Sequence, residues 1–214
     1  MYYNKIFIYF KEFCIIYVVI FMYVINNNIE NEINIKNSRF ICLLYKVNNI
    51  DIVKDILSSV KEKYPKATHY CYAYIIDNNK KSSDDNEPGG TAGIPILSSL
   101  DKNNLTNILC VVVRYFGGIK LGAGGLNRAY TKSVTDALCL VKFNPLVNGY
   151  LISIEIDYNE LDNINYILNN PMIKEKEFGE KIKLILELDQ NQLKLLDDNR
   201  YKYKILEEIL IEKR

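Results

Sequence analysis

Hydrophobic spacing in the first third of the chain predicts two strands, a helix and a further strand. Residues 33–47 read as two short strands around a turn at residues 36–39. Residues 49–64 carry apolar side chains at helical spacing, and the pattern stops at Pro65 because proline cannot continue a helix. Residues 69–74 then alternate with a period of two, which is typical of a strand.

The rest of the chain predicts a strand and helix and then a second set of elements beyond Pro145. Residues 105–116 form a continuous β-branched run, typical of a strand covered on both faces, and residues 125–142 return to helical spacing. The later elements are a strand, a helix, a hairpin, a helix and a strand, at residues 150–156, 159–169, 173–188, 190–198 and 203–211. This βαββαβ order is the ferredoxin-like arrangement. The sequence therefore predicts an α+β protein with domains at residues 33–144 and 148–214.

Residues 1–32 form an apolar N-terminal extension with three possible interpretations. Residues 6–25 are nearly all apolar, but Lys11 and Glu12 interrupt them and leave a run shorter than the about 20 residues of a membrane span. No small-residue cleavage site follows, as a signal peptide would require. The segment is a membrane or signal segment, an appended helix that packs on the domain, or upstream sequence before a true start at Met22. We expect no membrane association unless the first 25 residues are genuine.

Composition excludes several classes of protein. The chain has 27 Lys and Arg residues against 26 Asp and Glu residues, so any nucleic-acid surface must be local. Five cysteines without a CxxC pair indicate reduced thiols in a cytoplasmic protein. His69 is the single histidine, which excludes a cluster of histidine metal ligands and makes any Ser-His or Cys-His nucleophile depend on that residue. We expect no metal, no cofactor and no catalytic residue.

Eight of the ten glycines lie between residues 89 and 125 and mark two loops with demanding backbone shapes. The first, which we name the acidic loop, spans residues 82–95, and the second, the glycine loop, spans residues 117–125. Candidate residues in the acidic loop are Asp84, Asp85, Glu87 and Thr91. Candidate residues in and around the glycine loop are Arg114, Gly117, Gly118, Lys120, Gly122, Gly124, Gly125 and Arg128.

The glycine loop has the composition of an anion site. Free N–H groups at the start of the following helix, its positive dipole end and the nearby cations would together hold a phosphate. The nucleotide fingerprints are absent, because there is no GxxxxGK[ST] and a GxGxxG beginning at Gly122 meets Asn127 where the third glycine belongs. The alternative is a tight strand-to-helix turn in which Arg114 and Arg128 pair with the acidic loop.

The acidic loop and His69 each have two interpretations. The carboxylates of Asp84, Asp85 and Glu87 suit Mg²⁺, or they form a solvated turn that supplies internal ion pairs. We favour the second interpretation because Mg²⁺ usually needs substrate phosphates as further ligands. His69 is a general acid or base, a base-stacking residue, or a half-buried histidine hydrogen-bonded to a neighbouring loop. A lone histidine without an identified partner favours the last.

Four segments closely resemble the signature of the IMPACT/YigZ family. They are SRF at residues 38–40, HYCYAY at 69–74, DDNEPGGTAGIPIL at 84–97 and VVVRYFGGIKLGAGGLNRAY at 111–130. The match runs in order over roughly half of the chain. The sequence after Pro145 is similar to the second domain that bacterial members carry, a ferredoxin-like unit similar to domains of elongation factor G.

The resemblance implies a first domain with the fold of the second domain of ribosomal protein S5. It also implies a role around translation: eukaryotic members regulate the general-control kinase pathway by competing for its activator, and bacterial members are suggested to bind nucleic acid or ribosomes. It brings no catalytic residue. Two positions depart from the family, since Asn86 stands where glycine is usual and Ile94 where a basic residue is usual. Members usually begin shortly before the SRF segment with a polar lead-in, which favours the start at Met22.

We therefore expect a non-catalytic translation-associated regulator that binds RNA or the ribosome through the glycine loop. The basic positions that match the family are Arg114, Lys120 and Arg128. Two alternatives remain at this point: a protein-binding regulator of a stress-response pathway, and a phosphate- or nucleotide-handling enzyme that uses the acidic loop with Mg²⁺.

Overall fold

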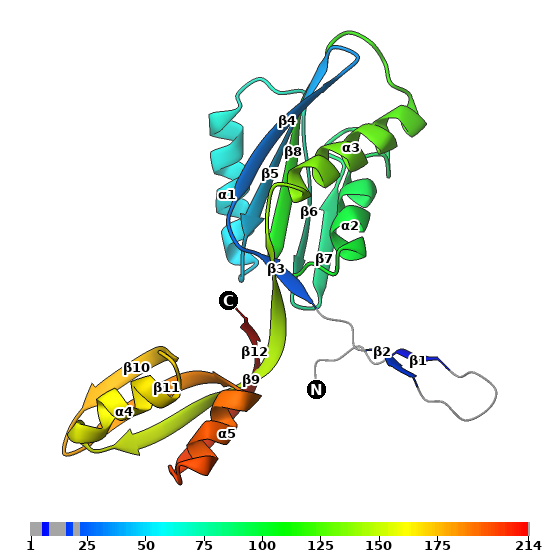
Figure 1. Ribbon diagram of the computed structural model, residues 1–214. Helices are drawn as coiled ribbons and strands as arrows, with labels where there is room; N and C mark the ends of the chain where they lie inside the picture. The colour runs from blue at the N-terminus through cyan, green and yellow to red at the C-terminus, as the bar shows by residue number, and fades with distance from the viewer. Residues whose placement is uncertain (1–5, 9–15, 19–21, 214) are drawn as a thin grey trace. The chain divides into compact units, whose positions relative to one another are not determined.

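The computed structural model describes residues 6–8, 16–18 and 22–213, and the chain divides into two compact units, residues 1–144 and 145–214 (Figure 1). Each unit has its own hydrophobic core. The units are described separately below.

The N-terminal extension lies mostly outside the described residues, which leaves the start at Met22 a prediction. Two short strands, β1 (Ile6–Ile8) and β2 (Ile16–Val18), pair antiparallel. The expectation of an appended helix is therefore wrong for these residues, which are strands. Within the described part of the chain, no helix has both the length and the apolar character needed to cross a membrane.

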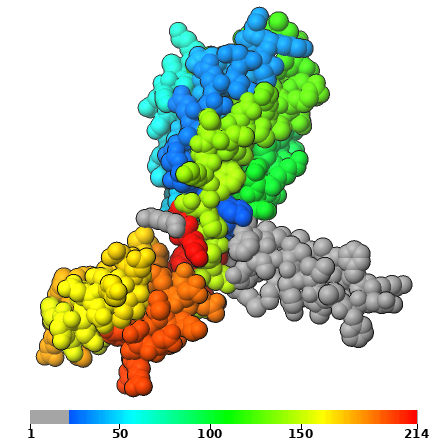
Figure 2. All heavy atoms as spheres, viewed as in Figure 1, coloured from blue at the N-terminus to red at the C-terminus, as the bar shows by residue number. Residues whose placement is uncertain are grey.

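Unit 1 is built on a five-stranded antiparallel sheet with the order β4-β5-β8-β6-β7. Its strands are β4 (Ile29–Ile35), β5 (Ser38–Lys46), β6 (His69–Ile76), β7 (Asn79–Ser83) and β8 (Ile108–Tyr115). Its helices are α1 (Asp51–Lys63), α2 (Gly93–Lys102) and α3 (Ala123–Leu138). Helix α1 covers one face of the sheet, and α2 and α3 cover the other (Figure 1). In the space-filling view, α3 in yellow-green lies beside β4 in blue on the surface of this unit (Figure 2).

Alternating residues of the central strands supply two cores, one on each face of the sheet. Phe40 and Cys42 of β5 point toward α2 and α3, whereas Ile41 and Leu43 pack toward α1. Strand β8 is buried on both faces over seven of its eight residues. This confirms the sheet position that its continuous apolar run predicted.

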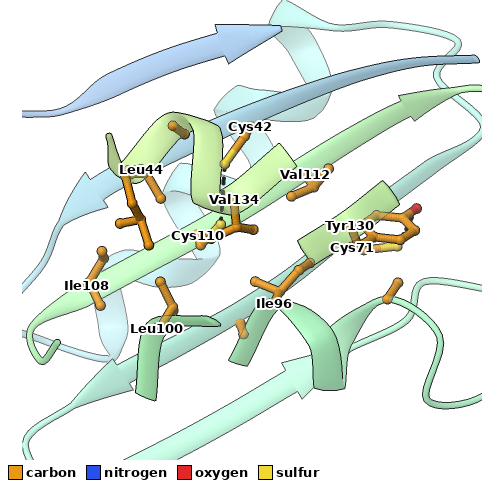
Figure 3. Packing of buried hydrophobic residues seen from close by; sticks show 14 of the residues in the cluster. Cys42, Leu44, Cys71, Ile96, Leu100, Ile108, Cys110, Val112, Tyr130 and Val134 are labelled. Atoms are coloured by element: carbon orange, nitrogen blue, oxygen red, sulfur yellow. Dashed lines mark hydrogen bonds between the residues drawn. The ribbon is translucent and has the colours of Figure 1, made fainter. Parts of the chain in front are cut away.

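The core under α2 and α3 is closely packed (Figure 3). Ile96 and Leu100 of α2 and Val134 of α3 are fully buried in this core. Two buried thiols, Cys42 and Cys110, lie with their Sγ atoms 3.6 Å apart. Each fully buried aliphatic side chain contributes about 1.5–3 kcal/mol to stability, so this core anchors both helices to the sheet.

Unit 1 differs from the sequence prediction at its start and in the acidic loop. Val24 and Ile25 of β3 (Tyr23–Ile25) are buried in the core and β4 begins at Ile29, so the folded domain starts earlier than residue 33. The acidic loop is not loop throughout, since β7 ends at Ser83 and α2 begins at Gly93. Strand β7 is an edge strand rich in polar residues and α2 opens with glycine, so neither has the usual signals.

A two-residue turn between β4 and β5 explains one obligatory glycine. Lys36 and Asn37 both have positive φ, 45° and 63°, as a tight hairpin turn requires. Their turn lies against the end of β8, where a Cβ atom on Gly117 would collide with the backbone of Asn37. The glycine loop therefore begins with a residue that permits this close approach.

Unit 2 confirms the predicted βαββαβ order. Its elements are β9 (Phe143–Ile156), the 3₁₀ turn η1 (Tyr158–Glu160), α4 (Leu161–Ile167), β10 (Met172–Phe178), β11 (Ile182–Asp189), α5 (Gln190–Asp198) and β12 (Tyr203–Glu212). The strands pair antiparallel in the order β10-β11-β9-β12, which is the ferredoxin-like topology. Every second residue of β11 is buried in one core with residues of α4 and α5.

Candidate anion-binding site

The glycine loop leads from the end of β8 into the start of α3. Gly118 and Gly122 have positive φ, 86° and 69°, so the chain turns at positions that favour glycine. Gly122 is the N-cap residue of α3, and it has no side chain to accept a hydrogen bond from the first turn. The first turn of α3 also contains no acidic residue. Because the first N–H groups of a helix have no acceptor within it, the start of α3 is free to bind an anion.

A pocket of about 400 Å³ lies at the start of α3. Its polar lining, which we name the floor, is formed by His69, Glu87 and Arg114, whose side chains are 15%, 3% and 5% exposed. Its apolar walls include Pro88, Phe116, Leu121 and Leu126. Lys120, Gly122 and Ala123 also line it and are exposed to solvent. The pocket thus brings together residues of the glycine loop, the acidic loop and the start of β6.

Arg114 forms a buried ion pair with the acidic loop. Its Nη1 lies 2.5 Å from Oε1 of Glu87, and the two side chains are 5% and 3% exposed. The Tyr130 hydroxyl donates to the same carboxylate oxygen at 2.8 Å. The Arg114 guanidinium also lies 5.3 Å from the ring centre of Phe40. Arg114 therefore takes the position that the alternative interpretation gave it, and its charge is balanced by Glu87.

The His69 ring is held by a backbone carbonyl of the acidic loop. Its Nδ1 lies 2.8 Å from the carbonyl oxygen of Asp85, and because a carbonyl can only accept, Nδ1 carries the hydrogen. Its Nε2 lies 3.8 Å from Oε2 of Glu87. The side chain is 15% exposed, which is the arrangement expected of a half-buried histidine hydrogen-bonded to a neighbouring loop.

Asp84 caps helix α2 from outside the helix. Its carboxylate accepts hydrogen bonds from the N–H groups of Gly90, Ala92 and Gly93 at 2.8–2.9 Å. Partial burial alone would raise the pKa of Asp84, but these three donors outweigh it and lower the pKa below its usual value. The carboxylate is therefore occupied by the backbone.

The other candidates in the acidic loop also have structural partners. Asp85 accepts the N–H of Tyr70 at 2.7 Å, and the Thr91 hydroxyl donates to the carbonyl of Pro88 at 2.6 Å. Asn86 has a φ of 66°, so its replacement of glycine keeps the left-handed backbone. Among the described residues, no group of His, Cys, Asp and Glu side chains is arranged to hold a metal ion.

Cys71 borders this network but is not arranged as a nucleophile. Its thiol donates to the carbonyl of Asp84 at 3.0 Å and lies 3.3 Å from the hydroxyl of Tyr130 (Figure 3). Burial raises the pKa of the Cys71 thiol to about 12, and the thiol rather than the reactive thiolate is present at neutral pH. Burial likewise raises the pKa of Tyr130 well above its usual value.

Two cations near the start of α3 remain free. Neither Lys120 nor Arg128 forms an ion pair with any other described residue, and both are exposed. A Cβ atom on Gly124 would lie 3.5 Å from Nη1 of Arg128, so this side chain leans back along the first turn of α3. The structure therefore gathers Lys120, Arg128 and the glycines that open the helix, whereas it turns Arg114 inward.

Gly117 lies apart from this group. Its N–H donates to the hydroxyl of Ser38 at 3.2 Å, and Nη2 of Arg114 lies 3.3 Å from the same hydroxyl. The roles of Ser38 and Tyr130 were not predicted from the sequence, although both residues lie within the family motifs. Their burial on strand β5 and helix α3 becomes evident only when the two elements meet.

Comparison with known proteins identifies the family. Residues 36–138 match the model of the Impact N-terminal domain. The chain is 38% identical over 168 residues to the IMPACT family member YvyE of Bacillus subtilis, a match that covers 76% of this chain and 77% of that protein. The chain belongs to the IMPACT family.

Other relatives extend the similarity to both sequence and fold. The IMPACT family member YigZ of Escherichia coli is 37% identical over 139 residues, which cover 63% of this chain and 68% of YigZ. A solved structure described only as that of a hypothetical protein is similar over 92% of this chain and all of its own, with a TM-score of 0.63 and 29% identity. The mixed α and β fold in two units is thus shared with a protein of known structure.

Proposed function

We propose that this chain is a non-catalytic, translation-associated regulator of the cytoplasm that binds RNA, on or near the ribosome, through the glycine loop. The start of α3 is the single observation that carries the proposal: it has no capping side chain, no acid in its first turn, and it opens on a pocket beside Lys120. Family membership supports the link to translation, because the IMPACT resemblance implies such a role.

The chemistry of the site suits a phosphate of an RNA backbone. The N–H groups of the first turn supply fixed donors and the helix dipole favours a negative charge. Lys120 and Arg128 add two flexible cations without internal partners among the described residues. The chain as a whole carries a net charge of +1, so attraction to RNA must come from this local group rather than from a general field.

Arg114 has a different role in this proposal. Because Glu87 already balances its charge, Arg114 holds the acidic loop against the end of β8 and does not contact the phosphate. The enzyme alternative is less well supported, since Asp84, Asp85 and Glu87 are all engaged by backbone or side-chain partners. An acidic protein partner would use the same cations, so the experiment must distinguish RNA from protein.

Sedimentation of the full-length chain with ribosomes from the source cell tests the proposal. Pelleting is expected at low salt and should decrease at moderate salt, because counterion release makes phosphate contacts salt-dependent. Arg128→Glu and Lys120→Glu should weaken pelleting, and Lys54→Glu should not, because Lys54 lies on α1 on the other face of the sheet.

A nuclease-treated sample separates the two classes of partner. The chain should bind purified ribosomal RNA, and nuclease digestion of that RNA should abolish the binding. Pelleting that is equal in wild type and Arg128→Glu, or binding that persists on protein after nuclease treatment, would contradict RNA binding at the glycine loop and transfer the assignment to a protein partner.

A further inference from the structure

One oxygen of the buried Glu87 carboxylate has no hydrogen-bond donor. Oε1 accepts from both Arg114 and Tyr130, whereas Oε2 accepts from none of the described residues. Nε2 of His69 is 3.8 Å from Oε2, which is too long for a hydrogen bond. The side chain is 3% exposed and lines the pocket. Oε2 is therefore an open acceptor that faces the pocket.

His69 places a second acceptor beside the first. Its Nδ1 hydrogen is donated to the carbonyl of Asp85, which assigns the tautomer and makes Nε2 the acceptor nitrogen of the imidazole. Nε2 and Oε2 of Glu87 lie 3.8 Å apart in the same pocket. Two neighbouring acceptors without a donor suit a ligand group that carries N–H bonds, and they repel a group that offers only carbonyl oxygens.

The walls of the pocket suit a flat, apolar body. Phe116 is 44% exposed and lines the pocket together with Leu121 and Leu126. Aromatic side chains that remain exposed beside a basic groove commonly stack on bases. The volume of about 400 Å³ lies near the lower end of small-molecule sites, which is consistent with a single base.

The start of α3 completes the set of requirements. The N-cap residue Gly122 and the first helical residue Ala123 line the pocket together with Lys120. A ligand that fits the whole pocket therefore has a negative group at the helix start, a flat body along the apolar walls and an N–H donor at the floor.

We propose that this pocket binds one nucleotide whose base carries an amino group, namely adenine, cytosine or guanine, and that it discriminates against uracil. The amino group donates to Oε2 of Glu87 and Nε2 of His69, and the phosphate lies at the start of α3. Uracil is disfavoured because carbonyl oxygens flank its one available N–H. The inference rests on the proposed function of the same site and names its ligand; the nucleotide is free or is an unpaired residue of an RNA strand.

Titration calorimetry of the full-length chain with mononucleotides tests the inference. AMP, CMP and GMP should each bind about tenfold more tightly than UMP, the discrimination expected of one well-formed set of base contacts. Ribose 5-phosphate should bind no better than UMP. Equal affinity for the four mononucleotides would overturn the inference.

Variants of the floor identify the atoms that discriminate. His69→Phe keeps a ring but removes the acceptor, and Glu87→Gln turns one acceptor into a donor. Either variant should reduce the preference for AMP, CMP and GMP over UMP to about twofold or less, as expected for the loss of one base contact. Phosphate binding should persist. Since Glu87→Gln alters a buried ion pair, the partly exposed His69→Phe decides the outcome if Glu87→Gln does not fold. Lys54→Glu serves as the unaffected control.

Short RNA oligonucleotides separate this inference from the proposed function. Tighter binding of oligo(A) and oligo(C) than of oligo(U) supports the base pocket with RNA as the source. Mononucleotide preference without binding of any oligonucleotide supports the base pocket and contradicts RNA as the partner. Salt-sensitive binding of all oligonucleotides without base preference overturns the base pocket and leaves the RNA proposal standing.

Discussion

Arg114 and Glu87 form an ion pair at 2.5 Å in which both side chains are almost fully buried. The pair joins the strand that precedes the glycine loop to the acidic loop, two segments that are 27 positions apart in the chain. It also organises the pocket, because Tyr130 donates to the same carboxylate and the guanidinium lies 5.3 Å and 5.5 Å from the ring centres of Phe40 and Phe116. The ion pair therefore joins two of the four segments that resemble the family signature.

This ion pair should be essential to stability. Arg114→Met leaves an unpaired buried carboxylate and should lower the free energy of unfolding by about 3–5 kcal/mol. Urea unfolding followed by circular dichroism measures the change. The double variant Arg114→Met/Glu87→Met should recover much of the loss, since burying two apolar groups avoids the unpaired charge. A loss below about 1 kcal/mol in the single variant would show that the pair is not held as described.

The Asp84 cap should make unit 1 sensitive to acid. The pKa of Asp84 is lowered in the folded chain, so its contribution to stability is fully present above the ordinary pKa of 3.8 and is lost as pH falls through the folded value. Asp84→Asn should cost about 0.5–2 kcal/mol at pH 7, the range for loss of a helix cap. Its unfolding free energy should also depend less on pH over this acidic window.

The exposed residue Asp55 on α1 provides the matched control for this prediction. Asp55→Asn should leave both the stability at pH 7 and its acid dependence close to wild type. If Asp84→Asn and Asp55→Asn show the same pH profile, the three backbone donors do not stabilise the charged form of Asp84.

Two neighbouring glycines should differ in their tolerance of a methyl group. Gly117→Ala places a Cβ atom against the backbone of Asn37, and it should cost about 2–3 kcal/mol, the upper range for overpacking. Gly118→Ala enters open space but at a φ of 86°, so it should cost about 1 kcal/mol from backbone strain alone. Thermal unfolding of the two variants measures the difference. Equal costs would mean that the hairpin turn does not press on the glycine loop.

The sequence predicted those helices and strands whose hydrophobic spacing matches the faces that they bury. Strand β8 was recognisable because it is covered on both faces, and the βαββαβ order of unit 2 followed from alternating and helical spacing. Helix α2 was missed because its cap, Asp84, lies nine residues before Gly93 and reaches the helix through space. The start of unit 1 was placed too late because Ile25 joins a core formed by distant strands.

The candidate site was predictable in composition but not in the roles of its members. Glycine content and local charge indicated an anion site, and the structure places Lys120 and the helix start together at the pocket. The sequence spacing does not reveal that Arg114 points inward to Glu87, because Arg114 lies on β8 whereas Glu87 lies in the acidic loop. Nor does it reveal the open acceptor at Glu87, which depends on where the donors of Arg114 and Tyr130 point.

The salt dependence of RNA binding tests the central claim most directly. Fluorescence anisotropy with a short single-stranded RNA gives the slope of log affinity against log salt for wild type, Arg128→Glu and Lys54→Glu. We predict a steep wild-type slope that falls by about 0.7 or more in Arg128→Glu and is unchanged in Lys54→Glu. An identical slope in all three proteins would contradict phosphate binding at the start of α3.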